Sequence, residues 1–121
     1  MDVQQAAEDL VRQVQEGKAM AAFDQYYAED VVMQENEQPP VAGKAANRER
    51  ELQFFGGVEQ VHEIRAVRSA CQGDVAMTEW VFDVTFKGGA RKKWHQVAVQ
   101  QWKGGKVASE KFYYDTGAAK A

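Results

Sequence analysis

Apolar residues recur at helical spacing through the first 27 positions of the chain. The pattern predicts a first helix with Asp2 as its N-cap and Gly17 as its C-terminal stop. The apolar stripe of this helix consists of Val3, Ala7, Leu10, Val11 and Val14. A second, shorter helix carries its apolar side on Met20, Phe23 and Tyr27, and we expect it to end at Tyr27 and residues 28–30 to turn the chain. The chain therefore begins with two amphipathic helices in succession.

The pattern then becomes extended over residues 31–35, VVMQE, because β-branched residues favour a strand there. Pro39 and Pro40 close this short strand. From 44 to 55 the helical pattern returns in an unusually polar form, KAANRERELQFF, and the two glycines at 56–57 end it. We expect a third helix with few apolar anchors.

The second half of the chain is extended. Three glycine-containing turn signals divide it, at 72–74, 87–90 and 103–106. The four segments between and around them are 58–71, 75–87, 91–103 and 107–115. Short turns favour an antiparallel meander, so helices followed by a sheet predict an α+β class. No linker or repeat interrupts this order, and we expect a single domain over residues 1–121.

Residue alternation assigns faces to the strands. In the segment 75–87 the predicted inward side chains are Trp80, Phe82, Val84 and Phe86. The segment 91–103 has no cleanly polar face. One of its faces holds Trp94, Gln96, Ala98, Gln100 and Trp102, and the other holds His95, Val97, Val99 and Gln101. We therefore expect helices on one side and a partner subunit on the other, a homodimer through Val97, Val99 and His95.

Composition narrows the function classes. A net charge of -3 argues against sequence-independent nucleic-acid binding, which needs a basic face. No apolar run approaches the length of a membrane span, and no secretory signal opens the chain. The single cysteine, Cys71, excludes an intrachain disulfide and favours a cytoplasmic location. No zinc spacing, phosphate loop or dinucleotide fingerprint occurs, so we expect no metal and no cofactor.

The order helix, helix, short strand, helix and four strands, with YYAEDVVMQE after the second helix and GGKVASEKFYYD at the end, resembles the nuclear transport factor 2-like superfamily. It is most similar to the SnoaL-like and ketosteroid-isomerase-like branches, over residues 3 to 115. The resemblance implies a cone-shaped, cystatin-like α+β barrel. In this fold three N-terminal helices pack in a curved, mainly antiparallel sheet, and a cavity opens at one end for a small organic molecule. It also implies a homodimer through the outer sheet face.

The resemblance implies roles for individual residues. The position of the general base in the isomerase branch corresponds to Glu35 in this chain. The strand register implied by the resemblance directs five side chains into the cone: Gln96, Gln100, Glu110, Phe112 and Tyr114. The oxyanion-stabilising pair does not carry over, because its positions hold Leu10 and Ala98. Stabilisation of the oxyanion by such donors is usually the largest contribution to the rate enhancement, so their loss argues against steroid isomerisation. For SnoaL-like cyclases the acid–base counterparts are His95 and Asp115, although strand parity puts both outside unless a bulge intervenes.

Each candidate has a structural alternative. Glu35 is either a cavity base with a raised pKa or a solvated strand-end glutamate. Asn47, Arg50, Glu51 and Phe54 share one helix face at i, i+3, i+4 and i+7. Arg50 could pair there with Glu35, Glu51 or an anionic ligand, but we favour a solvated helix face. Gln96 and Gln100 are either the polar lining of a cavity or part of an exposed strand face.

The sequence thus predicts a small-molecule-binding protein. One hypothesis is a cofactor-free lyase, isomerase or cyclase in which Glu35 abstracts a proton and Gln96, Gln100 or Tyr114 polarises the substrate. The other is a non-catalytic binding or dimerisation module with a vestigial pocket. The catalytic candidates are Glu35, Tyr114, Asp115 and His95. The ligand-binding candidates are Met33, Asn47, Arg50, Phe54, Trp80, Phe82, Trp94, Gln96, Gln100, Glu110 and Phe112.

Overall fold

The computed structural model of the chain describes residues 1–116; the last five residues of the expected domain, 117–121, lie outside the described residues. Its helices are α1 (Val3–Gln15), α2 (Ala19–Tyr26) and α3 (Lys44–Gly56). Its strands are β1 (Tyr27–Glu35), β2 (Val41–Ala42), β3 (Val58–Gln72), β4 (Val75–Phe86), β5 (Arg91–Lys103) and β6 (Lys106–Tyr113). The predicted element order is confirmed, with one addition that was not predicted, the two-residue strand β2.

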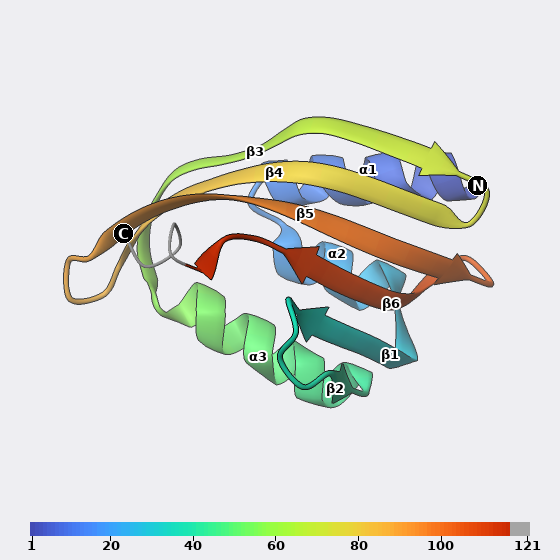
Figure 1. The fold of residues 1–121 in the computed structure, drawn as a ribbon, viewed down its shortest axis with the longest axis horizontal. Helices are drawn as coiled ribbons and strands as arrows, with labels where there is room; N and C mark the ends of the chain where they lie inside the picture. The colour runs from blue at the N-terminus through green and yellow to red at the C-terminus, as the bar shows by residue number, and fades with distance from the viewer. Residues whose placement is uncertain (117–121) are drawn as a thin grey trace.

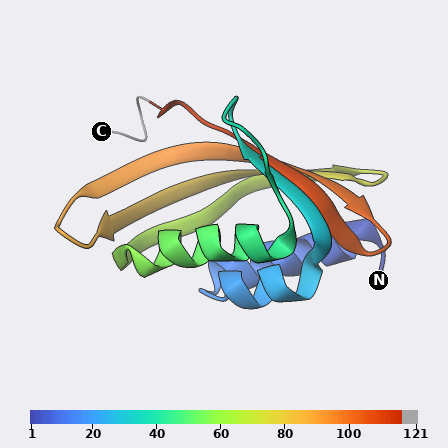
Figure 2. The same cartoon turned by 90° about the horizontal axis from the view of Figure 1, so that it is seen from below.

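The strands form one sheet in the order β2-β1-β6-β5-β4-β3. Strands β3 to β6 are an antiparallel meander, as predicted, whereas β1 pairs with β6 in parallel. The sheet is curved, and the three helices lie on its concave side (Figure 1 and Figure 2). This arrangement is the expected α+β cone.

The start of β1 differs from the prediction. We expected Tyr27 to end the second helix and residues 28–30 to form a turn, but β1 begins at Tyr27. The Tyr27 backbone is extended, with φ -89° and ψ 135°, while its N–H still donates to the Phe23 carbonyl as the C-cap of α2. The register between β1 and β6 shifts between Tyr27 and Val32. A strand irregularity therefore replaces the expected turn, and Tyr27 becomes a residue of the cone wall.

Two clusters of buried side chains lie on the concave side of the sheet. One lies where α1 and α2 meet the sheet and includes Phe23, Tyr26 and Trp102. The other lines the inner side of β4 and β5 and includes Trp80, Phe82 and Trp94. Strand alternation places these aromatic rings on the concave face, as predicted for β4.

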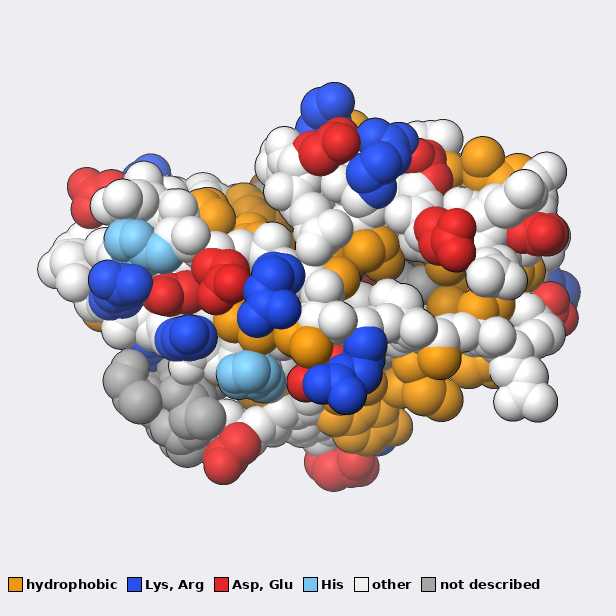
Figure 3. Space-filling model, turned by 90° about the horizontal axis from the view of Figure 1, so that it is seen from above, with side chains coloured by type: hydrophobic (Ala, Val, Ile, Leu, Met, Phe, Trp, Pro, Cys, Tyr) orange, Lys and Arg blue, Asp and Glu red, His pale blue; other side chains and the backbone are white. Residues whose placement is uncertain are grey.

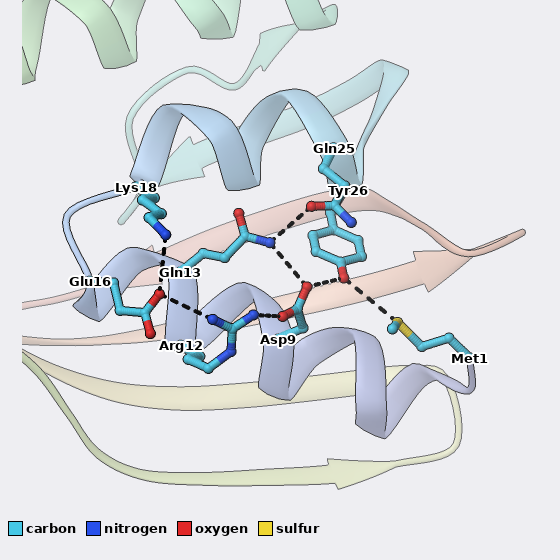
Figure 4. A network of polar contacts seen from close by, with 8 residues as sticks. All are labelled: Met1, Asp9, Arg12, Gln13, Glu16, Lys18, Gln25 and Tyr26. Carbon is cyan, nitrogen blue, oxygen red and sulfur yellow. Dashed lines mark hydrogen bonds and ion pairs between the residues drawn. The ribbon is translucent and has the colours of Figure 1, made fainter.

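A polar network fastens α1 to α2 (Figure 4). Asp9 accepts hydrogen bonds from Tyr26, Arg12 and Gln13, and the Gln13 amide also donates to Gln25 at 2.9 Å. The Tyr26 hydrogen bond is the main reason that the pKa of Asp9 lies below its usual value. Burial raises the pKa of Tyr26 to about 12, so this hydroxyl keeps its proton and remains a donor. The two helices therefore form a fixed wall of the cone.

The sheet edge formed by β3 presents a surface of mixed charge. Acidic and basic side chains are intermixed on the face seen from above in Figure 3.

Within residues 1–116, no helix combines the length and apolar character that crossing a membrane requires.

Candidate functional site

A cavity of about 630 Å³ lies between the helices and the concave face of the sheet. Ten of its 24 lining residues are aromatic: Phe23, Tyr27, Phe54, Phe55, Trp80, Phe82, Phe86, Trp94, Phe112 and Tyr114. Phe82 stacks on Trp94 at 5.4 Å between ring centroids, and Phe54 of α3 meets Trp94 edge-on at 6.2 Å. A space of this size and character suits a small organic molecule with a large apolar part.

Of the polar side chains described in the cavity lining, Glu110 on β6 is the most buried, at only 4% exposed. The Tyr27 hydroxyl donates to its Oε1, and the Gln100 amide donates to its Oε2 at 2.8 Å. The Trp102 indole in turn donates to Gln100 Oε1 at 3.0 Å. Because an indole can only donate, Trp102 fixes which end of the amide faces Glu110. We call Tyr27, Gln100, Trp102 and Glu110 the floor cluster.

Burial dominates the electrostatics of the floor cluster. It raises the pKa of Glu110 to about 7, against the two donated hydrogen bonds, which lower it. Burial, with Glu110 beside it, also holds the pKa of Tyr27 well above its usual value, so Tyr27 remains a donor. Glu110 can therefore exist as acid or carboxylate near neutral pH.

A second polar group lies where the cavity meets solvent. Glu35, whose side chain is 43% exposed, accepts from Arg50 Nη1 at 3.0 Å and from the Tyr114 hydroxyl at 3.1 Å. Asn36 follows β1 with a positive φ of 48°, and its amide oxygen accepts from the Tyr114 backbone N–H at 3.0 Å. Burial and the neighbouring Glu35 raise the pKa of Tyr114. We call Glu35, Arg50 and Tyr114 the rim cluster.

The polar face of α3 covers the cavity, so the solvated helix face that we favoured for Asn47, Arg50, Glu51 and Phe54 is wrong. Asn47 is fully buried, and its amide donates to the Val41 and Gly43 carbonyls at 2.9 Å each. Its Oδ1 accepts from the Arg50 guanidinium at 3.2 and 3.3 Å. Asn47 thus anchors the start of α3 and orients Arg50 toward Glu35. The helix has few apolar anchors because its inner face lines a hollow with polar groups.

Glu51, the residue that follows Arg50 on α3, also lines the cavity. Burial raises the pKa of its carboxyl to about 7, repulsion from Glu110 and Glu35 adds to this, and Arg50 opposes it. Among residues 1–116, no set of three His, Cys, Asp or Glu side chains is arranged to hold a metal ion.

The SnoaL-like domain family matches residues 1–114 of the chain. This chain belongs to the SnoaL-like domain family. No curated protein shows significant similarity to it.

Solved structures agree with this membership. A Mesorhizobium loti protein described as a SnoaL-like polyketide cyclase is 28% identical, with a TM-score of 0.83 over 94% of this chain and 100% of that one. A Xanthomonas campestris protein of unknown function with a cystatin-like fold has a TM-score of 0.83 at 17% identity, covering 98% and 95%. A Mycobacterium tuberculosis LEH-like epoxide hydrolase has a TM-score of 0.75 at 16% identity, covering 98% and 86%. The last two likenesses show the fold alone.

In this SnoaL-like chain most of the predicted site residues line one cavity. They are Glu35, Arg50, Phe54, Trp80, Phe82, Trp94, Gln96, Gln100, Glu110, Phe112 and Tyr114. Leu10, where the isomerase pattern has a donor, lines the cavity as well, and Ala98 is buried on the same inner side. Their predicted roles in binding and catalysis stay predictions.

Four predicted residues lie outside the cavity lining. Met33 is 1% exposed, because its side chain packs into the core cluster that includes Phe23 and Tyr26. Asn47 packs against backbone, as described above. His95 is exposed on the outer sheet face, because β4 and β5 pair without a register shift around it. Asp115 is exposed beyond the end of β6. The bulge that a cyclase-like role of His95 and Asp115 requires is absent from this part of the sheet.

Sequence reasoning missed Tyr27 and the orienting role of Trp102. Each tryptophan of β5 stands two residues from a glutamine on the same face, and each indole donates to that glutamine oxygen. The second pair, Trp94 to Gln96, measures 3.0 Å. The Trp–Gln spacing of two residues in the sequence could have indicated this arrangement. Each indole occupies the oxygen of its glutamine, so the NH₂ group of that glutamine is left to donate to another partner.

Proposed function

We propose that this SnoaL-like chain binds a small, largely apolar organic molecule in its cone and transfers a proton on it with Glu110 as the acid–base group. The observation that carries this proposal is a carboxyl buried in the cavity wall with a pKa of about 7, oriented by two donors. A base with a pKa near the working pH transfers protons most efficiently. The reaction class is that of a cofactor-free lyase, isomerase or cyclase.

The proposed step needs no cofactor. The Glu110 carboxylate takes a proton from carbon next to a carbonyl, and the bonding pair moves into an enolate whose charge rests on the carbonyl oxygen. The proton returns from Glu110 to the same carbon or, where the substrate has a double bond that extends the enolate to a dienolate, to its γ-carbon. Gln96, whose oxygen is already held by Trp94, offers its NH₂ group as a donor to that oxygen.

Glu35 is better suited to orientation than to proton abstraction. Unlike Glu110, it is ion-paired with an arginine, Arg50, and its side chain is 43% exposed to solvent. An ion-paired, hydrated carboxylate is a weaker base than a desolvated one. The Mesorhizobium loti relative, described as a polyketide cyclase, supports an enzyme over a vestigial pocket.

Proton abstraction is testable without the natural substrate. We expect the protein to catalyse exchange of the α-protons of 4-phenylcyclohexanone with D₂O, followed by NMR, and Glu110→Gln to slow that exchange by about 100-fold or more. Glu37→Gln is the matched control, because Glu37 is exposed and pairs with Lys111 outside the cone. Exchange at the wild-type rate in Glu110→Gln would contradict the role of Glu110. Binding without exchange by the wild type would favour the binding module.

We also propose the predicted homodimer through the outer sheet face. Val97, Met77 and Tyr113 are large apolar residues exposed there, and the strand register makes them neighbours, with Val97 opposite Tyr113 and Met77 opposite Val99. A contiguous apolar patch of this kind is typical of an interface. A cytoplasmic location and the absence of nucleic-acid and membrane partners stay predictions.

The dimer proposal makes a direct prediction. Val97→Glu should convert a dimer into a monomer in sedimentation velocity, since it places a charge inside an apolar interface. Leu52→Glu is the control, because Leu52 is similarly exposed on α3, away from the outer face. A wild-type protein that sediments as a monomer at 100 μM would disprove the dimer.

A further inference from the structure

Among the carboxylates that line the cavity, Glu51 differs from the others. Glu35 is held by Arg50 and Tyr114, and Glu110 by Tyr27 and Gln100. Within residues 1–116, no hydrogen bond or ion pair holds the Glu51 carboxylate, which lines the cavity and is partly shielded from water. Shielding a carboxylate from water without giving it a partner is unfavourable. Its position in a binding cavity suggests that a ligand supplies the partner.

The charges around Glu51 specify the sign of that partner. Arg50 is the cation whose charge acts on Glu51, but Arg50 already pairs with Glu35 at 3.0 Å. The other lining cation, Lys92, is eight residues from Gln100 along β5, a strand length of about 26 Å. Gln100 contacts Glu110, so Lys92 lies far from the acidic end of the cavity. The acidic end therefore carries an excess of carboxylates that a positive group would relieve.

The aromatic walls of the cavity also favour a positively charged ligand. Ten of the 24 lining side chains are aromatic, and ring faces attract cations. A neutral ligand would bury the apolar surface equally well but would leave the repulsion between Glu51 and Glu110 in place. An anionic ligand would increase that repulsion. A cation on an apolar body satisfies both the walls and the acidic end.

We propose that Glu51 binds the positively charged end of the ligand, a protonated amine carried on an apolar body. This inference rests on the proposed function, since it takes the cone as the ligand site. Glu51 anchors the ammonium group and leaves Glu110 free to exchange a proton elsewhere on the molecule. Glu51 is thus a specificity-determining residue.

Binding should be linked to proton release. An ammonium group beside Glu51 favours its charged form, and that of Glu110 nearby. The charged or titratable groups that face Glu51 are Arg50 on its own helix, Glu35 and Tyr27 from β1 and Glu110 from β6. Amine affinity should therefore rise from pH 6 to pH 8, and the binding enthalpy at pH 7 should change with the ionisation enthalpy of the buffer.

The test uses three molecules of one shape: 4-phenylbutylamine, 4-phenylbutan-1-ol and 4-phenylbutyrate. Binding is measured by calorimetry and by the indole N–H signals of Trp80 and Trp94, which line the cavity. We expect the amine to bind about tenfold or more tightly than the alcohol, and the carboxylate most weakly. Glu51→Gln should remove the preference for the amine while changing alcohol affinity less than about twofold.

Glu49→Gln is the matched control, since Glu49 is exposed on the same helix and the substitution removes the same charge. It should keep the full preference for the amine. Equal binding of amine and alcohol by the wild type, or a preference that survives Glu51→Gln, would overturn the amine proposal and leave the cavity as a ligand site. If none of the three molecules shifts the indole signals, the proposed function fails, and this inference fails with it.

Discussion

The protein should lose stability as the pH rises from 4.5 through 7, whereas carboxylates in folded proteins usually cause the opposite. Glu110 is the cause, since its pKa is 4.5 when unfolded and about 7 when folded. Between these values the folded state binds a proton that the unfolded state has released. The stabilisation is complete below pH 4.5 and is lost as the pH passes the folded pKa. The shift corresponds to about 3 kcal/mol for this group, because each pKa unit is about 1.4 kcal/mol. Glu51 acts in the same direction.

The substitution Glu110→Gln tests the cause. A neutral amide of the same shape can accept from Gln100 and donate to Tyr27, whose hydroxyl both donates and accepts. We expect the variant to match the wild type near pH 4.5 and to exceed it by about 3 kcal/mol at pH 8, where the wild type must hold a buried charge.

Urea unfolding at half-unit steps from pH 4.5 to 8 measures this difference. Below this window, loss of the ion pairs of Asp24 and Asp83, whose pKa values are lowered by Arg48 and Arg91, destabilises both proteins alike. Glu37→Gln should follow the wild type, since its carboxylate is exposed. A Glu110→Gln curve parallel to that of the wild type would show that Glu110 is already charged in the folded protein at pH 4.5.

The order of the elements could be predicted because the spacing of apolar residues changes clearly from helical to strand-like along the chain. Helical spacing ends near Gly57, and glycine turns then separate four long strands, so local pattern and tertiary fold agree. The parallel pairing of β1 with β6 could not be predicted in this way. Nothing local to residues 27–35 distinguishes a parallel from an antiparallel neighbour, because that choice depends on the path of the helices.

The candidate site was harder to predict for a related reason. Polar residues at i, i+3 and i+4 on α3 are typical of a solvated helix face, yet here they line a hollow. The inward direction of Glu110 followed from strand parity, but its importance did not, since the cost of burying it depends on Tyr27, Gln100 and Trp102 from other parts of the chain. Residue patterns indicate which side chains share a face of a helix or strand. The burial of a side chain and its hydrogen-bond partners can be known only from the fold.

Trp102 should be the side chain whose truncation costs the most. It is 1% exposed, meets Tyr26 edge-on at 5.7 Å and donates to Gln100 at 3.0 Å. Trp102→Ala should reduce the free energy of unfolding by about 4 kcal/mol, since it leaves a cavity in the core. That is a large part of the roughly 5–15 kcal/mol that stabilises a domain of this kind.

Trp102→Phe separates packing from orientation. It keeps most of the ring volume but removes the donor, so the cost should fall to about 1–2 kcal/mol. The Gln100 amide then has no donor to fix it and can turn its oxygen toward Glu110, which should raise the pKa of Glu110 in an NMR titration of its carboxyl carbon. Glu49→Ala, at an exposed position of α3 outside the proposed interface, should change stability by less than about 0.5 kcal/mol. If Trp102→Phe left the pKa of Glu110 unchanged, Trp102 would be a packing residue only, and the floor cluster would owe its orientation to Tyr27 and Gln100 alone.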